Sequence, residues 1–215
     1  SEGGLIAPMV AVNSNDFSYI VLLAGPGLPG KDILLLQAKL ISKAEGEKTE
    51  MIEKSSLLNE KIYDAVLSEE NNTVAEEKIR ALYDDFYNSL TAEEKKEADG
   101  RKQMIEQGIK QLTKPWFRFF MKFDPRPVLE SVTVPVLALN GEKDLQVPPK
   151  ENLVEIEKAL KVGGNTNFKI VELQNLNHLF QTARTGSPSE YGTIEETFSP
   201  DALKIIKDWI LEVNK

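Results

Sequence analysis

The chain has 215 residues, 41% of them hydrophobic and 28% charged, which suits one domain or one domain with a sizeable insertion. Its net charge of −8 disfavours nucleic acid or an anionic membrane as the main partner, because phosphate binding depends on clustered Lys and Arg. The absence of cysteine excludes thiolate chemistry, a single histidine makes a metal site not credible, and no apolar run is long enough to predict a membrane span.

The start of the chain predicts a helix followed by a buried strand. Residues 3–13, G-G-L-I-A-P-M-V-A-V-N, are small and apolar, which is typical of a helix packed between a sheet and its neighbours. Residues 18–24, S-Y-I-V-L-L-A, form a short apolar run that ends at the breakers G-P-G-L-P-G. Such a run predicts a strand buried on both faces, as in a parallel sheet.

The long segment 31–122 has a different character, since it is rich in Glu, Lys, Leu and Ala and contains no convincing strand. We expect a Leu-rich helix at residues 32–41, and residues 74–90 place their apolar side chains on one helical face. Two patterns fit the capping box that begins a helix: Thr73 with Glu76, and Thr91 with Glu94. The sequence therefore predicts an all-helical cap at 31–122, inserted into a core formed by residues 1–30 and 123–215.

Strands and helices alternate again after the cap. Residues 134–139, V-P-V-L-A-L, and residues 168–173, F-K-I-V-E-L, predict two further strands, and residues 150–160 and 200–213 predict helices. Strands that alternate with helices favour an α/β fold with a parallel sheet and right-handed crossovers.

Two candidate functional residues follow these last two strands. Asp144 lies in the turn N-G-E-K-D, and His178, the only histidine, lies in L-N-H-L-F. Taken singly, an acidic residue in a turn is most often solvated, and a lone histidine more often packs or caps. Because the carboxyl ends of parallel strands meet at one edge of a sheet, we expect the two side chains to lie together. The carboxylate would then orient an imidazole that acts as a general base.

The first residues, Ser1-Glu2-Gly3-Gly4, add a candidate nucleophile. They match the S-x-G half of the G-x-S-x-G turn, in which a serine sits between a strand and a helix. The predicted small-residue helix follows Ser1 at once, as that turn requires. The order Ser1, Asp144, His178 is the one that α/β-hydrolases use, whereas the other familiar serine-hydrolase folds arrange the same trio differently.

Four phrases carry a resemblance to a known family: S-E-G-G-L-I-A-P-M, V-L-L-A-G-P-G-L-P-G, P-V-L-A-L-N-G-E-K-D-L-Q-V-P and N-L-N-H-L-F. They resemble the α/β-hydrolase superfamily, and more narrowly carboxylesterase-like serine hydrolases with a helical cap between the sixth and seventh strands. The resemblance implies strands six to eight of that fold, with Ser1 as nucleophile, Asp144 as acid, His178 as base and the backbone N–H of Glu2 as an oxyanion donor. It implies hydrolysis of carboxylic esters, with thioesters or small peptides as variants, and no cofactor.

The sequence also departs from that family. Strands one to five, the Gly-x before Ser1 and the loop with the second oxyanion donor are absent from it. Because losing one oxyanion donor costs about 100- to 1,000-fold in rate, we expect this polypeptide alone to be a truncated, nearly inactive form. Equal turnover of p-nitrophenyl acetate by this chain and by a longer one would contradict that expectation.

An aromatic cluster closes the cap, and Trp116, Phe117 and Phe120 within it are candidates for a substrate pocket. The alternative is that these rings form core where the cap rejoins the sheet. The loop G-P-G-L-P-G lacks both the Lys-Ser/Thr of a P-loop and the spacing of a dinucleotide fingerprint.

Two other functions stay open. An N-terminal nucleophile hydrolase would use the α-amine of Ser1 as base, but that class has layered antiparallel sheets, which the strand–helix alternation disfavours. A non-catalytic binding or oligomerising fragment is the other alternative. A three-stranded sheet would leave an apolar edge exposed, so we expect a homo-oligomer or strand-swapped pairing through that edge.

Overall fold

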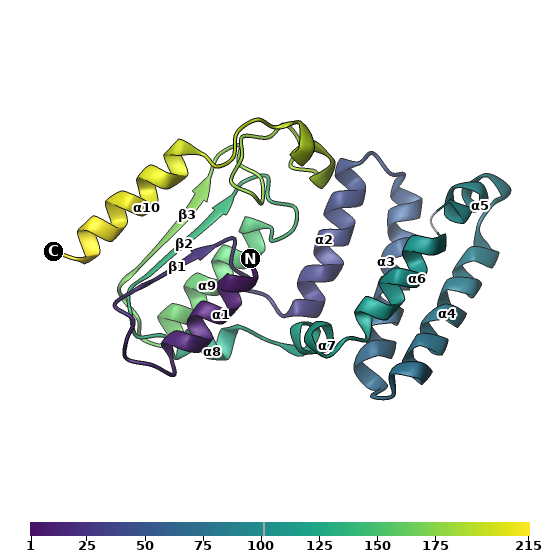
Figure 1. The fold of residues 1–215 in the computed structure, drawn as a ribbon, viewed down its shortest axis with the longest axis horizontal. Helices are drawn as coiled ribbons and strands as arrows, with labels where there is room; N and C mark the ends of the chain where they lie inside the picture. Colours follow the sequence, from purple (N-terminus) through teal and green to yellow (C-terminus); the bar gives the residue numbers. More distant parts are fainter. Residues whose placement is uncertain (101) are drawn as a thin grey trace. The chain divides into compact units, whose positions relative to one another are not determined.

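The computed structural model describes residues 1–100 and 102–215, which form two units (Figure 1). The sheet unit consists of Ser1–Gly46 and Asp124–Lys215, and the helical unit is Glu47–Phe123. The division after Gly46 differs from the expected cap boundary at residue 31. The helix that follows G-P-G-L-P-G therefore belongs to the sheet unit.

The sheet unit is built on three parallel strands in the order β1-β2-β3 (Figure 1). Their bounds are Ile20–Leu23 for β1, Val136–Gly141 for β2 and Phe168–Leu173 for β3. The register pairs Ile20 with Val136, and Val136 in turn with Phe168. The mixed α/β arrangement with parallel strands that we predicted is confirmed.

The sheet unit also contains several helices. They are α1 (Glu2–Ala11), α2 (Gly30–Ala44), α8 (Arg126–Glu130), α9 (Pro149–Val162) and α10 (Pro200–Val213), with a 3₁₀ helix η1 (Pro188–Thr193). Figure 1 shows α1, α8 and α9 on one side of the sheet and α10 on the other. Both faces of the sheet are thus covered, as expected for parallel strands.

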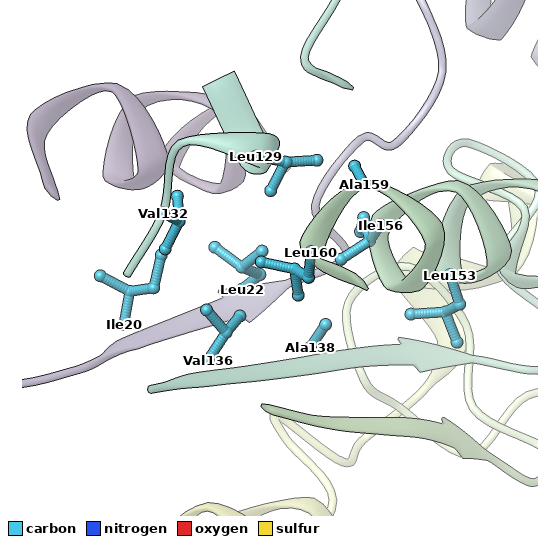
Figure 2. Close-up of a cluster of buried hydrophobic side chains, with 10 residues drawn as sticks. All are labelled: Ile20, Leu22, Leu129, Val132, Val136, Ala138, Leu153, Ile156, Ala159 and Leu160. Atoms are coloured by element: carbon cyan, nitrogen blue, oxygen red, sulfur yellow. The ribbon is translucent and has the colours of Figure 1, made fainter. Parts of the chain in front are cut away.

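The central strand β2 divides two hydrophobic clusters, because successive side chains of a strand point to opposite faces. Val136 and Ala138 point into the first cluster, where Ile156 and Leu160 of α9 cover them (Figure 2). Leu137 belongs to the second cluster. All of these side chains are fully buried. Because both faces of β2 are covered, its sequence is a continuous apolar run and does not alternate between apolar and polar residues.

Helix α10 covers the opposite face of the sheet. Its Trp209 is buried and meets the ring of Tyr19 edge-to-face, with the ring centroids 5.5 Å apart. Ala202 of the same helix is fully buried in this second cluster. The predicted closing helix at 200–213 is therefore confirmed, and its apolar stripe fixes the orientation of the last segment of the chain.

The helical unit contains five helices among its described residues: α3 (Thr49–Ser68), α4 (Asn72–Ser89), α5 (Ala92–Asp99), α6 (Lys102–Leu112) and α7 (Pro115–Lys122). The capping box of Thr91 with Glu94 is confirmed at the start of α5. The box predicted at Thr73 is wrong, because α4 begins earlier. Its cap is Asn71, whose side-chain oxygen accepts from the backbone N–H groups of Thr73 and Val74.

Candidate active site

The loops that follow β2 and β3 meet at the carboxyl edge of the sheet. Gly141, the last residue of β2, lies against the second loop so closely that a Cβ there would be 2.2 Å from the carbonyl oxygen of Leu176. Two residues on, the Lys143 N–H donates to the same carbonyl over 2.9 Å. A glycine at position 141 is therefore what allows the two loops to touch.

The Asp144 side chain is at the centre of this contact and is only 1% exposed. Its Oδ1 accepts from the backbone N–H groups of Gln146, at 2.9 Å, and Val147, at 2.8 Å. Its Oδ2 lies 2.9 Å from Nδ1 of His178. One carboxylate oxygen is thus held by the chain's own turn, and the other is left for the imidazole.

The structure therefore brings together two of the three residues predicted for a triad. The His178 side chain is 11% exposed, against 0% for the Asp144 carboxylate. With Nδ1 donating to a buried carboxylate, the neutral imidazole has its bare nitrogen at Nε2, on the opposite side of the ring. That tautomer suits proton abstraction by Nε2.

The loop that carries His178 is organised by the residue before it. Asn177 is fully buried, and its Oδ1 accepts from the backbone N–H groups of Leu179, at 2.9 Å, and Gln181, at 3.0 Å. Its Nδ2 donates to the Gln181 side chain over 3.0 Å. Three hydrogen bonds from one buried amide fix the backbone on both sides of the imidazole.

Two residues around His178 have left-handed backbone conformations. Asn175 has φ of 63° and Phe180 has φ of 59°, and for a bulky side chain such as Phe this is an outlier. Phe180 is nevertheless held firmly, since its ring stacks on Phe198 with centroids 5.1 Å apart and its carbonyl accepts from the Ser199 N–H. Backbone strain of this kind occurs preferentially at functional sites.

Asn140, at the end of β2, shapes the loop that carries Asp144. It is fully buried, and its Nδ2 donates to the Val147 carbonyl over 2.8 Å, while its Oδ1 has no partner among the described residues. Together with the Val147 N–H that binds Asp144, this bond closes the turn at both ends. Sequence reasoning missed Asn140 and Asn177. The sequence did contain a signal for each: Asn140 stands at the end of an apolar strand, and Asn177 directly precedes the only histidine.

Ser1 is the N-cap of α1, and within the described residues its hydroxyl makes no hydrogen bond. The structure thus shows no hydrogen bond between Ser1 and His178. Electrostatics do relate Ser1 to the site: burial lowers the pKa of its α-amino group, while the carboxylates of Asp144 and Glu2 act in the opposite direction. The acid of the pair is therefore within electrostatic range of Ser1.

Helix α1 is held against the end of β1 by two glycines. A Cβ at Gly4 would lie 2.5 Å from the Cα of Gly25, which follows β1. Gly3, the position that matches the second glycine of the G-x-S-x-G turn, would meet nothing within 4 Å. The close approach of helix and strand at this edge therefore depends on Gly4 rather than on the motif glycine.

A phenol lies beside the acid loop, and sequence reasoning did not select it. Tyr191 of η1 accepts a 2.9 Å hydrogen bond from Nε2 of Gln146. Burial raises the pKa of Tyr191, the bond from Gln146 opposes this, and the charge of Asp144 raises it further. Tyr191 therefore stays protonated at neutral pH, and no pattern in its surroundings, P-S-E-Y-G-T, indicated a place near Asp144.

The predicted aromatic residues lie in the helical unit. Phe117 lines a hollow in that unit, and its ring centroid is 6.3 Å from that of Phe120. The Trp116 side chain is 45% exposed and stacks on Phe119 at 5.4 Å. Of the three candidates, Phe117 is among the residues that line this hollow.

Comparison with protein-family models, with curated proteins and with solved structures gives no match to this chain. Among the described residues, no group of three or more His, Asp or Glu side chains is arranged to hold a metal ion. None of the described helices combines the length and the apolar character needed to cross a bilayer.

Proposed function

We propose that this chain is a serine hydrolase of the α/β-hydrolase type that cleaves carboxylic esters, with thioesters and small peptides as close variants. The observation that carries the proposal is the 2.9 Å contact between Asp144 Oδ2 and His178 Nδ1 at the carboxyl edge of a parallel sheet. A buried carboxylate with its other oxygen fully bonded is suited to orienting an imidazole. The three strands then correspond to strands six to eight of that fold.

In the proposed reaction, Nε2 of His178 takes the hydroxyl proton of Ser1 as its Oγ attacks the ester carbonyl carbon. The imidazolium, stabilised by Asp144, gives this proton to the departing alcohol and leaves an acyl-Ser1. Water then attacks the acyl carbon, with His178 again as base, and the carboxylic acid and free Ser1 are released. Asp144 stays ionised throughout.

The N-terminus of α1 supplies stabilisation for the negative oxygen of the tetrahedral intermediate. The first N–H groups of a helix have no acceptor within it, and they lie at the positive end of the helix dipole. Glu2 opens α1, so its N–H is the proposed oxyanion donor next to Ser1. A donor held in this way acts on charge that exists only near the transition state.

Labelling with a fluorophosphonate tests the proposal. A reactive serine displaces fluoride and forms a phosphonyl ester, which intact-mass and peptide mass spectrometry locate. We expect slow labelling of Ser1, in line with the low activity expected of this polypeptide alone, no labelling in Ser1→Ala and a further decrease in His178→Gln. Ser14→Ala, in the loop after α1, is the matched control and should label like the unmodified protein. A label at another serine, or equal labelling of His178→Gln, would count against the proposal.

Self-association is a second candidate function, favoured by the edge of the sheet. Among the described residues β1 pairs only with β2, and Ile6 and Val10 of the adjoining α1 are exposed. We propose pairing of two copies through this edge, by association or strand exchange. Light scattering after size exclusion should show a dimer that Ile6→Glu weakens and that the control Leu203→Glu, on exposed α10 surface, does not. A monomer at all concentrations would contradict it.

A further inference from the structure

The helical unit contains a hollow of about 390 Å³. Four helices contribute to its wall, and the residues that line it include Asn59, Ile62 and Tyr63 of α3, Tyr83 of α4, Met104, Ile105 and Gly108 of α6, and Phe117 of α7. Its size falls in the range of about 300 to 1,000 Å³ that small-molecule sites occupy. All of these residues belong to one unit, so the hollow is a property of the helical unit alone.

The wall is apolar and carries no charge among the described residues that form it. Ile62 is fully buried in it, and Met104, 67% exposed, lies on the outer part of the wall. The polar groups are the amides of Asn59 and Gln111 and the hydroxyls of two tyrosines. A charged ligand would therefore leave water without gaining a counter-charge, which is costly.

The two tyrosines are the informative feature of this wall. Tyr63 is only 9% exposed, and no hydrogen bond joins its hydroxyl or that of Tyr83 to another described residue. Neither hydroxyl oxygen is among the fully buried polar atoms that lack a partner, so both reach the open space of the hollow. Two hydroxyl donors that face one apolar hollow can both bond to a single polar group of a ligand there.

Both phenols are donors at any physiological pH. Burial, with a smaller effect from Tyr83, raises the pKa of Tyr63 to about 12. Burial also raises the pKa of Tyr83. The hollow therefore offers O–H groups to a ligand and never phenolate.

We propose that this hollow binds a neutral, largely apolar small molecule whose carbonyl or ester oxygen accepts hydrogen bonds from Tyr63 and Tyr83. The apolar wall takes the body of the molecule, and the two hydroxyls take its single polar end. This site does not depend on the proposed hydrolase activity, since none of its residues belongs to the Ser1–Asp144–His178 set.

Fluorescence titration of the full chain with the neutral naphthyl ketone 6-propionyl-2-(dimethylamino)naphthalene tests the proposal. This probe has one carbonyl acceptor on an apolar body, and its emission shifts to the blue when it leaves water. We expect saturable binding that Tyr63→Phe and Tyr83→Phe each weaken about 3- to 10-fold, since each removes one hydroxyl without changing ring volume. Tyr87→Phe, one turn further along α4, is the matched control and should leave binding unchanged.

A filling variant gives an independent test. Gly108 lines the hollow, and a Cβ at this helical position would meet nothing within 4 Å. Gly108→Leu should therefore keep the fold, checked by circular dichroism, and decrease probe binding at least 10-fold, with Gly108→Ala intermediate.

Three results would overturn the inference. They are the absence of saturable binding to the unmodified chain, unchanged binding in folded Gly108→Leu, and equal affinity for the anionic 8-anilinonaphthalene-1-sulfonate with the same response to Tyr63→Phe. Dissociation of a dimer by Gly108→Leu would instead assign the hollow to a second copy and reject the small-molecule site. Fluorophosphonate labelling of Ser1 reports on the hydrolase proposal separately, and neither result decides the other.

Discussion

Replacing Asp144 separates the structural role of its carboxylate from its role toward the imidazole. Asp144→Ala leaves the backbone N–H groups of Gln146 and Val147 without the acceptor that now lies within 2.9 Å of each. An unsatisfied buried donor costs about 1–3 kcal/mol, and Val147 is buried, so we expect a loss of roughly 3 kcal/mol in the free energy of unfolding. Asp144→Asn keeps an oxygen for both donors and should cost less than about 1 kcal/mol.

The same Asn variant should nevertheless remove the reactivity of Ser1. Its side-chain N–H₂ group would donate to Nδ1 of His178 and force the proton onto Nε2, which can then no longer act as a base. A wrong tautomer in a triad lowers the rate on the order of 10,000-fold. Urea unfolding and the rate of fluorophosphonate labelling measure the two effects. An Asp144→Asn protein that labels at the normal rate, or an Asp144→Ala protein as stable as the unmodified chain, would refute the reasoning.

Two further predictions concern stability. Gly141→Ala should lower the free energy of unfolding by about 2 kcal/mol or more, because its Cβ would meet the Leu176 carbonyl oxygen at 2.2 Å. Gly108→Ala, at an open helical position, should raise the free energy of unfolding by up to about 1 kcal/mol. Urea titrations that rank the two variants the other way would contradict this. Hydrogen bonds from Arg126 hold the pKa of Asp124 below its usual value. They therefore stabilise the folded protein at pH values above the unfolded pKa of about 4, and this stabilisation is lost as the pH falls through the folded pKa. Arg126→Gln should therefore cost under about 1 kcal/mol at pH 7, since the pair is partly exposed, and less as the pH is lowered through the folded pKa of Asp124. A cost that does not decrease in acid would contradict this.

The strands and the Asp144–His178 contact could be predicted from the sequence because each depends on local signals. Short apolar runs between breakers mark the strands, and parallel strands bring the loops at their carboxyl ends to one edge. Neither step needs knowledge of how distant side chains pack. The position of Ser1 relative to His178 does depend on how distant side chains pack. For Ser1 the structure shows an electrostatic effect of Asp144 on its amino group but no hydrogen bond from its hydroxyl.

The boundary of the helical unit could not be read from composition. Residues 31–44 look like the helices that follow them, since they are rich in Leu, Lys and Ala. A long-range contact to the sheet unit is instead seen at Glu45, just past α2, whose carboxylate accepts from the hydroxyl of Ser187. A bond between residues 142 positions apart in the sequence leaves no periodic pattern.

The cap of α4 shows a similar limit. Thr73 has the spacing of a capping box, but Asn71 is an equally good capping residue two positions earlier. The Asn71 side chain accepts from two N–H groups, so the helix begins there and Thr73 becomes part of its first turn. Two capping residues that lie two positions apart compete, and motif spacing alone does not decide between them. The phenols of the hollow were not predictable either, because their burial depends on four separate helices.

The imidazole of His178 gives the most direct test, because it is the only histidine and its resonances need no assignment. Proton–nitrogen NMR of protein labelled with ¹⁵N-histidine should show, at pH 8, one tautomer with the proton on Nδ1 and a strongly downfield Nδ1–H signal that disappears in Asp144→Ala. A proton on Nε2, or an averaged mixture of tautomers that is the same in Asp144→Ala as in the unmodified protein, would contradict the claim that this buried carboxylate orients the imidazole to act as a base.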